Sequence, residues 1–273
     1  MPKGRWHGKA VTEGYKTVMN MEERKALVNS YLGKMVNIKI DRPIGYVHKR
    51  ENYALTYPIN YGYIPEVFGG DGEELDVYLL GVDKPVTDYV AKIIGIVYRM
   101  NDVEDKLIAA PEGVCFNQAE IAQYIHFQEQ YYETYIDAIY QKSCGAIIYR
   151  QINDKTEYLC ILQKRSGLYS VPKGHSEAFE TERQSAKREI YEEVGIKAEF
   201  KPNFKMEIQY DVPDNKQKTV VLFLCEHKGG IKIDCNEIKE YKWVEYEIAK
   251  KMLPKWYETV IDEAEKYINS LKF

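Results

Sequence analysis

Three glutamates in the second half of the chain are spaced so that they can share one metal ion. Glu189, Glu192 and Glu193 stand at positions i, i+3 and i+4, which puts their carboxylates on one face of a helix. Carboxylates this close repel one another unless a cation lies between them, and Mg²⁺ or Mn²⁺ prefers carboxylate oxygens. The cluster therefore indicates metal-assisted chemistry at phosphate oxygens. A solvated acidic helix face has the same spacing and is the ordinary alternative.

The residues flanking these glutamates predict the helix that carries them. Thr181 and Gln184 have the spacing of a capping box, in which each side chain bonds to the backbone of the other residue. Gly195 is a natural helix stop, because glycine adopts the left-handed conformation at low cost. We therefore expect a helix over 182–194.

Residues 174–196 match a known pattern over this whole segment. They read GHSEAFETERQSAKREIYEEVGI and resemble the Nudix box, G-x5-E-x7-R-E-U-x-E-E-x-G-U, at every fixed position. The resemblance implies an α/β/α sandwich that hydrolyses a phosphoanhydride bond in a small nucleotide-like substrate, with Mg²⁺ as cofactor and Mn²⁺ as the alternative. It also implies that Glu189, Glu192 and Glu193 hold the metal, that one of them activates water, and that Arg188 orients a glutamate through a salt bridge.

Segments outside the box resemble one group of Nudix enzymes, the asymmetric bis(5′-nucleosyl)-tetraphosphatases, which cleave diadenosine tetraphosphate to ATP and AMP. These segments are SCGAIIYR, SVPKGHSE, QYDVPDNKQKTVVLFLCEH and EIKEYKWVEYEIAKKML. Within SVPKGHSE, the resemblance makes Lys173 and His175 substrate-binding residues, although His175 serves equally well to stabilise the turn.

The same resemblance gives roles to four more residues. It implies that Tyr210 and Tyr267 stack on a base, that Lys218 binds phosphate and that Glu237 is an additional acid near the metal. An aromatic face stacks on any base, and a lysine supplies a point charge for a polyphosphate. Half-buried aromatics, a solvated turn lysine and a surface charge are the ordinary alternatives.

The first half resembles the soluble family I inorganic pyrophosphatases over about 35–140. Its most similar segments are YPINYGYIPEVFGGDGEELDV at 57–77 and HFQEQYY at 126–132. The resemblance implies metal ligands at Asp71, Glu73 and Asp76. It also implies an imperfect acid and lysine cluster and a set of phosphate-site tyrosines, which are Asp102, Asp105 and Lys106, and Tyr57, Tyr61 and Tyr131.

The basic residues of such a site are depleted in this sequence. Lys39 stands where an acid is expected, Tyr132 replaces a phosphate-binding lysine, and Lys49 or Arg50 is the remaining substitute for a missing arginine. A site with few cations stabilises transition-state charge poorly. We therefore expect a degenerate pyrophosphatase-like domain, with an active pyrophosphatase, and hence a bifunctional enzyme, as the alternative.

The patterning of the chain also predicts the elements that position these residues. Capping boxes at Asn20 and at Asn117 begin a short helix before Gly33 and a long helix over about 118–140. Between them lie short β-like runs separated by Pro, Gly and Asp-rich turns, which is typical of a barrel. We expect an α+β protein with three parts and no flexible linker between the last two: an extension over 1–33, a pyrophosphatase-like β-barrel with a long helix over 34–141, and a Nudix α/β/α sandwich over 142–273.

Composition limits the partners and the location of the protein. The net charge of −4 leaves no broad basic surface for nucleic acid. We see neither an apolar leader nor a membrane-spanning run, and we expect a cytoplasmic protein, which can be a homo-oligomer. The five cysteines are scattered and are expected to be buried reduced thiols.

Two other functions stay open on the sequence alone. One is a Nudix hydrolase for another nucleoside diphosphate derivative, such as a nucleotide sugar, capped RNA or a damaged nucleotide. The other is a nucleotide-sensing binding protein, in which the first half reads the signal. The intact glutamates of the box argue against binding alone.

Overall fold

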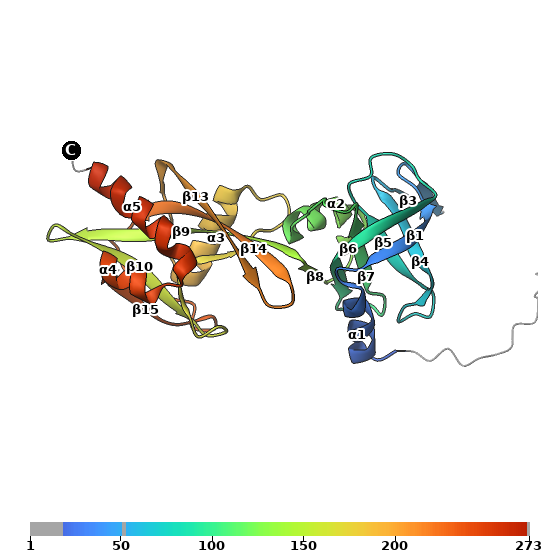
Figure 1. The fold of residues 1–273 in the computed structure, drawn as a ribbon, viewed down its shortest axis with the longest axis horizontal. Coiled ribbons are helices and arrows are strands. Elements are labelled where there is room, and N and C mark those ends of the chain that lie inside the picture. The colour runs from blue at the N-terminus through green and yellow to red at the C-terminus, as the bar shows by residue number, and fades with distance from the viewer. Residues whose placement is uncertain (1–18, 51–52, 272–273) are drawn as a thin grey trace, which may run out of the picture.

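The computed structural model describes residues 19–50 and 53–271 of the chain. It has two halves that lie end to end along the long axis of the molecule (Figure 1). The first contains a six-stranded sheet and the second a seven-stranded sheet.

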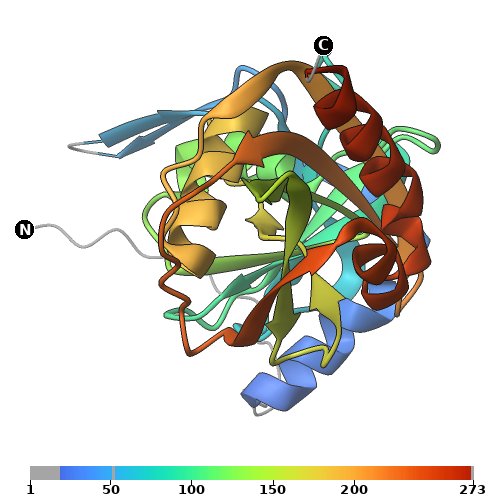
Figure 2. The same cartoon turned by 90° about the vertical axis from the view of Figure 1, so that its left-hand side faces the viewer.

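The first half is a barrel with helices at its ends. β1 pairs with both β4 and β6, so the order β1-β4-β5-β7-β6 closes on itself, and β8 is added beside β6. The hairpin of β2 and β3 forms a separate small sheet and projects from the barrel (Figure 2). The elements are α1 (Met21–Tyr31), β1 (Met35–Arg42), β2 (Val47–Arg50), β3 (Tyr53–Thr56), β4 (Asn60–Phe68), β5 (Glu74–Leu79), β6 (Asp88–Arg99), β7 (Lys106–Ala110), α2 (Gln118–Glu129) and β8 (Thr134–Ala138).

The second half is a sheet with helices on both faces. One face packs its apolar residues against α3, and the other packs them against α4 and α5, as Figures 1 and 2 show. This is the α/β/α sandwich expected from the sequence. The elements are β9 (Tyr140–Ile152), β10 (Lys155–Gln163), β11 (Tyr169–Ser170), β12 (Lys173–His175), α3 (Glu182–Val194), β13 (Phe200–Val212), β14 (Lys216–Glu226), β15 (Ile238–Glu245), α4 (Tyr246–Met252), η1 (Lys255–Tyr257) and α5 (Glu258–Ser270).

Local signals at the helix ends are confirmed. The side chain of Asn20 accepts from the backbone N–H of Glu23, and the capping box is complete. α3 spans the predicted residues, begins with the capping box of Thr181 and Gln184, and ends at Gly195 with φ 70°.

The prediction of one long helix over 118–140 is wrong. The capping box at Asn117 begins α2 as predicted, but the helix ends at Glu129. Tyr135 and Ile136 lie in β8, which pairs with β6. Aromatic and β-branched residues favour a strand, and the open edge of β6 supplies the backbone hydrogen bonds that a strand needs. The apolar spacing that suggested a longer helix therefore comes from two different elements.

The two halves meet with almost no chain between them. β8 ends at Ala138 and β9 begins at Tyr140, and the backbone N–H of Gln217 donates to the carbonyl of Ile139 at 2.9 Å. The expectation of a junction without a flexible linker is confirmed.

Two further expectations have mixed or limited outcomes. Cys144, Cys160 and Cys225 are buried as expected, whereas Cys115 and Cys235 are exposed because they lie in loops. No helix within 19–50 and 53–271 is long and apolar enough to cross a membrane.

Candidate functional site

Arg188 holds the acidic residues of the box in a network. Its Nε and Nη2 donate to the two carboxylate oxygens of Glu180 at 2.7 and 2.9 Å. Its Nη1 donates to Glu189 at 2.8 Å and to Glu192 at 3.1 Å. Nη2 also donates to the backbone carbonyl of His175 at 2.9 Å, so the turn after β12 is tied to α3. Hydrogen bonds from Arg188 lower the pKa of Glu180 to about 2.

Glu193 and Glu189 extend from α3 into a confined space. Glu193 is 4% exposed and accepts from the backbone N–H of Lys173 at 2.8 Å. Burial and the nearby charges of Glu189 and Glu237 raise the pKa of Glu193 to about 8. Burial together with Glu192 and Glu237 also raises the pKa of Glu189. Glu237 is exposed just before β15, and its charge acts on both of these carboxylates.

Gly174 makes the position of Glu189 possible. A Cβ atom at residue 174 would lie 1.9 Å from Oε2 of Glu189, so the carboxylate fills the space that any other residue would use. Gly145, which faces Lys173 across β9 and β12, is equally restricted, since its Cβ would lie 2.1 Å from the carbonyl oxygen of Pro172.

The carboxylates fit a hard divalent cation by their chemistry. Burial and the charges of Glu189 and Glu237 raise the pKa of Glu193, burial and the charges of Glu192 and Glu237 raise the pKa of Glu189, and a cation among these carboxylates would remove that repulsion. Across residues 19–50 and 53–271, no three histidine, cysteine, aspartate or glutamate side chains are already placed to hold a metal ion. On this face Arg188 donates hydrogen bonds to the carboxylates of Glu189 and Glu192.

Cationic side chains face the carboxylates from the neighbouring strands. Burial and the charges of Lys173 and Arg165 lower the pKa of Lys218 to about 8, while Glu189 acts in the opposite direction. Burial also lowers the pKa of Lys173. Desolvation by the surrounding protein and the charges of Lys218, Lys173 and Arg165 lower the pKa of His175 to about 4, although part of this residue is open to solvent. Acidic and basic groups therefore lie close together in one region of the second half.

An aromatic pair stands beside this region. Tyr210 and Trp256 stack with their ring centroids 4.6 Å apart and their planes at 17°. Tyr210 lies directly opposite Lys218 in the β13–β14 pairing, and Trp256 is 40% exposed. The sequence reasoning missed Trp256, although a tryptophan in the turn KWY just before the last helix was a signal that could have been weighed.

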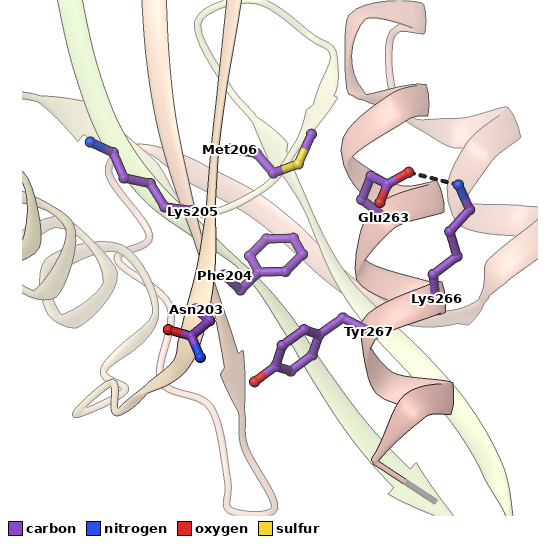
Figure 3. A pocket seen from close by; sticks show the side chains of 7 residues that line it. All are labelled: Asn203, Phe204, Lys205, Met206, Glu263, Lys266 and Tyr267. Carbon is purple, nitrogen blue, oxygen red and sulfur yellow. Dashed lines mark hydrogen bonds and ion pairs between the residues drawn. The ribbon is translucent and has the colours of Figure 1, made fainter. Parts of the chain in front are cut away.

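Tyr267 is not brought to this aromatic pair. Its hydroxyl donates to the carbonyl of Pro202 at 2.7 Å, and its ring packs edge-on against Phe204 at 5.7 Å. Phe204 is six residues from Tyr210 along β13, which is about 20 Å in a strand. Tyr267 instead lines a pocket of about 350 Å³ between β13 and α5 (Figure 3).

In the first half, Asp76 lies within a compact polar network. It accepts from Nζ of Lys106 at 2.6 Å and from the hydroxyl of Tyr61. Lys106 also pairs with Glu104 at 2.9 Å. Burial and the bond to Asp76 raise the pKa of Glu104 to about 7. Glu104 was missed by the sequence reasoning, although its spacing to Lys106 is that of an acid-x-lysine pair.

The other predicted acids of the first half make contacts of their own, although Asp102 shares Nη1 of Arg99 with Glu104 of this network. Asp71 accepts from the backbone N–H of Glu73 at 2.9 Å, and both side chains are exposed. Asp105 turns to Arg24 at 3.5 Å, and Asp102 pairs with Arg99 at 3.0 Å.

The cations and tyrosines near Asp76 only partly match the phosphate site expected from the resemblance to pyrophosphatases. Nη1 of Arg42 donates to the hydroxyl of Tyr57 at 2.8 Å, and its guanidinium lies over the ring of Tyr61 at 5.0 Å. The sequence reasoning missed Arg42 as a cation of this site. Lys49 lies on the β2–β3 hairpin, and the side chain of Arg50 lies outside the described residues.

Three more residues named in the comparison with pyrophosphatases have clear positions. Tyr132 covers the guanidinium of Arg99 at 3.6 Å, and Arg99 pairs with Glu129 at 2.7 Å while only 1% and 4% of the two side chains are exposed. Tyr131 is 63% exposed. Lys39 forms an exposed ion pair with Asp88 at 3.6 Å.

Comparison with known proteins assigns both halves to families. The NUDIX domain family matches residues 141–264, and the inorganic pyrophosphatase family matches residues 28–164. The fold and the box define a hydrolase of the Nudix class. The chain belongs to the Nudix family through its second half and to the inorganic pyrophosphatase family through its first half.

Individual relatives repeat this division. The asymmetrical bis(5′-nucleosyl)-tetraphosphatase of Sus scrofa is 31% identical over 144 residues, which cover 48% of this chain and 97% of that protein. The inorganic pyrophosphatase of Saccharolobus solfataricus is 42% identical over 80 residues, and the match covers 28% of this chain but only 42% of that enzyme. A solved Ap4A hydrolase of C. elegans covers 48% of this chain and 98% of its own, with 24% identity and a TM-score of 0.45.

Proposed function

We propose that the second half hydrolyses dinucleoside tetraphosphates asymmetrically, converting diadenosine tetraphosphate to ATP and AMP with Mg²⁺, or with Mn²⁺ in its place. The observation that carries the proposal is the combination of three chemistries in one region. Carboxylates of α3 face Lys218 and Lys173, and the stack of Tyr210 and Trp256 lies beside them. A polyphosphate that ends in two bases needs cations, a metal and an aromatic platform together.

Each residue of the site has a defined task in this proposal. Tyr210 and Trp256 receive a base, while Lys218 and Lys173 bind phosphate oxygens. Glu189, Glu192 and Glu193, with Glu237 beside them, would hold the divalent ion, which neutralises phosphate charge and lowers the pKa of water when bound. One of the α3 glutamates accepts the proton of the attacking water. Arg188 keeps these glutamates oriented, and His175 contacts phosphate or shapes the turn.

Tyr267 has a different place in the proposal. Its hydrogen bond to Pro202 and its contact with Phe204 support a role in packing α5 onto β13. We therefore assign the second stacking ring to Trp256, which contacts Tyr210 directly.

For the first half, over 34–141, we propose a degenerate pyrophosphatase-like domain. Lys106 forms ion pairs with both Asp76 and Glu104, so the charge of these two acids is already balanced by a lysine. Asp71 and Glu73 are exposed. Asp71, Glu73 and Asp76 remain the proposed ligands for a divalent ion there. A retained pyrophosphatase is the second candidate, because Arg42 and Lys106 both lie against Tyr61 and would supply part of a phosphate site.

A substrate panel tests the proposal. We would measure kcat/KM with Mg²⁺ for diadenosine tetraphosphate, a nucleotide sugar, a capped dinucleotide and pyrophosphate. We expect the dinucleoside tetraphosphate to have the largest value, by at least about tenfold. A larger value for the nucleotide sugar or the cap would replace the proposed substrate, and rapid pyrophosphate turnover would establish the bifunctional alternative.

A further inference from the structure

An ion pair joins the first half to the hairpin that carries Tyr210 and Lys218. Nζ of Lys216 donates to both carboxylate oxygens of Asp137, at 2.7 and 2.8 Å, and the two side chains are only 13% and 14% exposed. Asp137 lies on β8 of the first half, whereas Lys216 begins β14, directly after the turn of the β13–β14 hairpin. Lys218 lies two residues further along the strand, on the same face.

The last residues of this hairpin, 213–216, lie beyond the pairing of β14 with β9, which begins at Gln217 and Tyr140. Val212 and Lys216 are the last paired residues before the turn, and Gln217 donates its backbone N–H to Ile139 at the junction. The tip of a two-stranded hairpin frays readily unless something holds it. A charged hydrogen-bonded pair with little exposed surface fixes geometry strongly, so Asp137 sets where the end of this hairpin lies.

A second residue of the first half holds the opposite side of the site. The amide of Gln118, the first residue of α2, accepts from the backbone N–H of Lys142 at 2.8 Å. It donates to the carbonyls of Lys142 at 2.8 Å and Ser176 at 3.0 Å. Ser176 directly follows His175, whose carbonyl accepts from Arg188. One amide side chain thus lies a single residue from the network that orders the α3 glutamates.

Further along α2, a ring contact supports the same segment. His126 packs edge-on against Phe179, with ring centroids 5.1 Å apart. Phe179 has φ 66°, a conformation that costs energy for a residue with a side chain. The segment between β12 and α3 therefore rests on α2 at both of its ends.

We propose that Asp137 and Gln118 are positioning residues of the nucleotide site, so that the first half acts as part of the hydrolase. Asp137 acts through Lys216 on the wall that binds base and phosphate. Gln118 acts through Ser176 on the wall that orders Arg188 and the glutamates. The kinetic test of this proposal rests on the proposed function. The positioning of the two walls by Asp137 and Gln118 can be tested without it.

The two residues predict different kinetic effects in the full chain. Asp137→Asn should raise KM for diadenosine tetraphosphate roughly fivefold with little change in kcat, because the binding wall shifts. Lys216→Met should do the same, while Lys216→Arg keeps the charge and should retain the normal KM. Gln118→Ala should lower kcat roughly tenfold instead. Glu226→Gln removes a partly exposed ion pair with Lys201 away from the junction and should change neither constant.

Hydrogen exchange of the full chain without substrate separates this proposal from the choice of substrate. We expect faster exchange at the amide of Gln217 in Asp137→Asn and in Lys216→Met, and faster exchange over 176–180 in Gln118→Ala. Near-normal exchange at these amides would overturn the proposal, as would equal changes in KM and kcat for all variants including Glu226→Gln. If the wild type does not cleave the dinucleotide, the proposed function fails, and the exchange data still decide whether these residues position the site.

Discussion

Arg188 and Lys218 are the cations on which the proposed chemistry most depends, and they act in different ways. Arg188 is committed to Glu180, Glu189 and Glu192 through hydrogen bonds, so it orders carboxylates and has little capacity left for substrate. Lys218 has no such carboxylate bond among the contacts of the described residues, and burial with neighbouring cations lowers its pKa. Burial and like charges disfavour the protonated form of this lysine, and a polyanionic substrate bound beside it would stabilise that form.

The lowered pKa of Lys218 predicts how the stability of the protein and its kcat/KM depend on pH. The pKa of Lys218 is lowered from 10.5 to about 8 in the folded protein, so the folded state binds fewer protons than the unfolded state between these values, and stability rises with pH across this window. Substrate binding should show the opposite trend, because the cation is lost. We expect kcat/KM for diadenosine tetraphosphate to fall above about pH 8, since kcat/KM reports the free enzyme.

Lys218→Arg is the matched control, because arginine keeps its charge. In this variant the fall above pH 8 should disappear. A fall at the same pH in both proteins would assign the titration to another group.

Tyr210 predicts a loss that depends on the ring and not on the hydroxyl. If Tyr210 and Trp256 form the base platform, Tyr210→Ala should weaken substrate binding by ~1–3 kcal/mol, whereas Tyr210→Phe should bind almost normally. Binding of a slowly hydrolysed analogue can be followed by calorimetry. Equal losses for both variants would indicate that the hydroxyl makes the contact.

At the scale of elements, the residues that begin the helices were predictable and the residue that ends α2 was not. The capping boxes at Asn20, Asn117 and Thr181 are local signals, and each begins a helix where predicted. The end of α2 depends on contacts distant in sequence, since Glu129 is held by Arg99 of β6 and the following residues pair with that same strand. Such contacts cannot be read from local spacing.

Gly174, the central residue of β12, predicts a sharp effect of one added methyl group. Gly174→Ala places a Cβ where the carboxylate of Glu189 now lies, and the flexible end of that side chain can move away. The φ angle of Gly174 is not among the positive values, so alanine is tolerated by the backbone. We expect a folded protein whose kcat falls about a hundredfold or more.

Gly145→Ala provides the contrast for that experiment. Its Cβ would meet the backbone carbonyl of Pro172, which cannot move aside cheaply, so a lower melting temperature is expected there. A Gly174→Ala enzyme with normal kcat would show that the position of Glu189 is not needed.

For the whole molecule, the sequence predicted two families in one chain but not how their residues meet. The box, the capping boxes and the pyrophosphatase-like segment are contiguous patterns, and they identified α3 and the acidic side chains. Trp256 and Arg42 were missed because each gains its position through contacts distant in the chain. Glu104 was missed although its partner Lys106 is only two residues away. The ion pair of Asp137 with Lys216 joins residues with no common pattern.

Separate sites in the two halves predict separable effects. Asp76 bonds to Lys106 and Tyr61 within the barrel. It belongs to β5, a strand that lies far along the molecule from α3 (Figure 1). Asp76→Asn in the full chain should alter divalent-metal binding to the first half, measured by calorimetry, and should leave dinucleotide cleavage within about twofold of the wild type. Pyrophosphate turnover that is rapid in the wild type and lost in Asp76→Asn would show that the first half is a working pyrophosphatase.

The central claim is that the glutamates of α3 cleave a dinucleoside tetraphosphate asymmetrically, and product analysis tests it most directly. Glu192 is 57% exposed on its helix, so Glu192→Gln should fold normally, with Glu199→Gln, at 89% exposure, as a matched control. From diadenosine tetraphosphate and Mg²⁺, the wild type and the control should release equal amounts of ATP and AMP on chromatography. Glu192→Gln should release both at least about a hundredfold more slowly. Two molecules of ADP as the product, or normal release of ATP and AMP by a folded Glu192→Gln protein, would contradict the account.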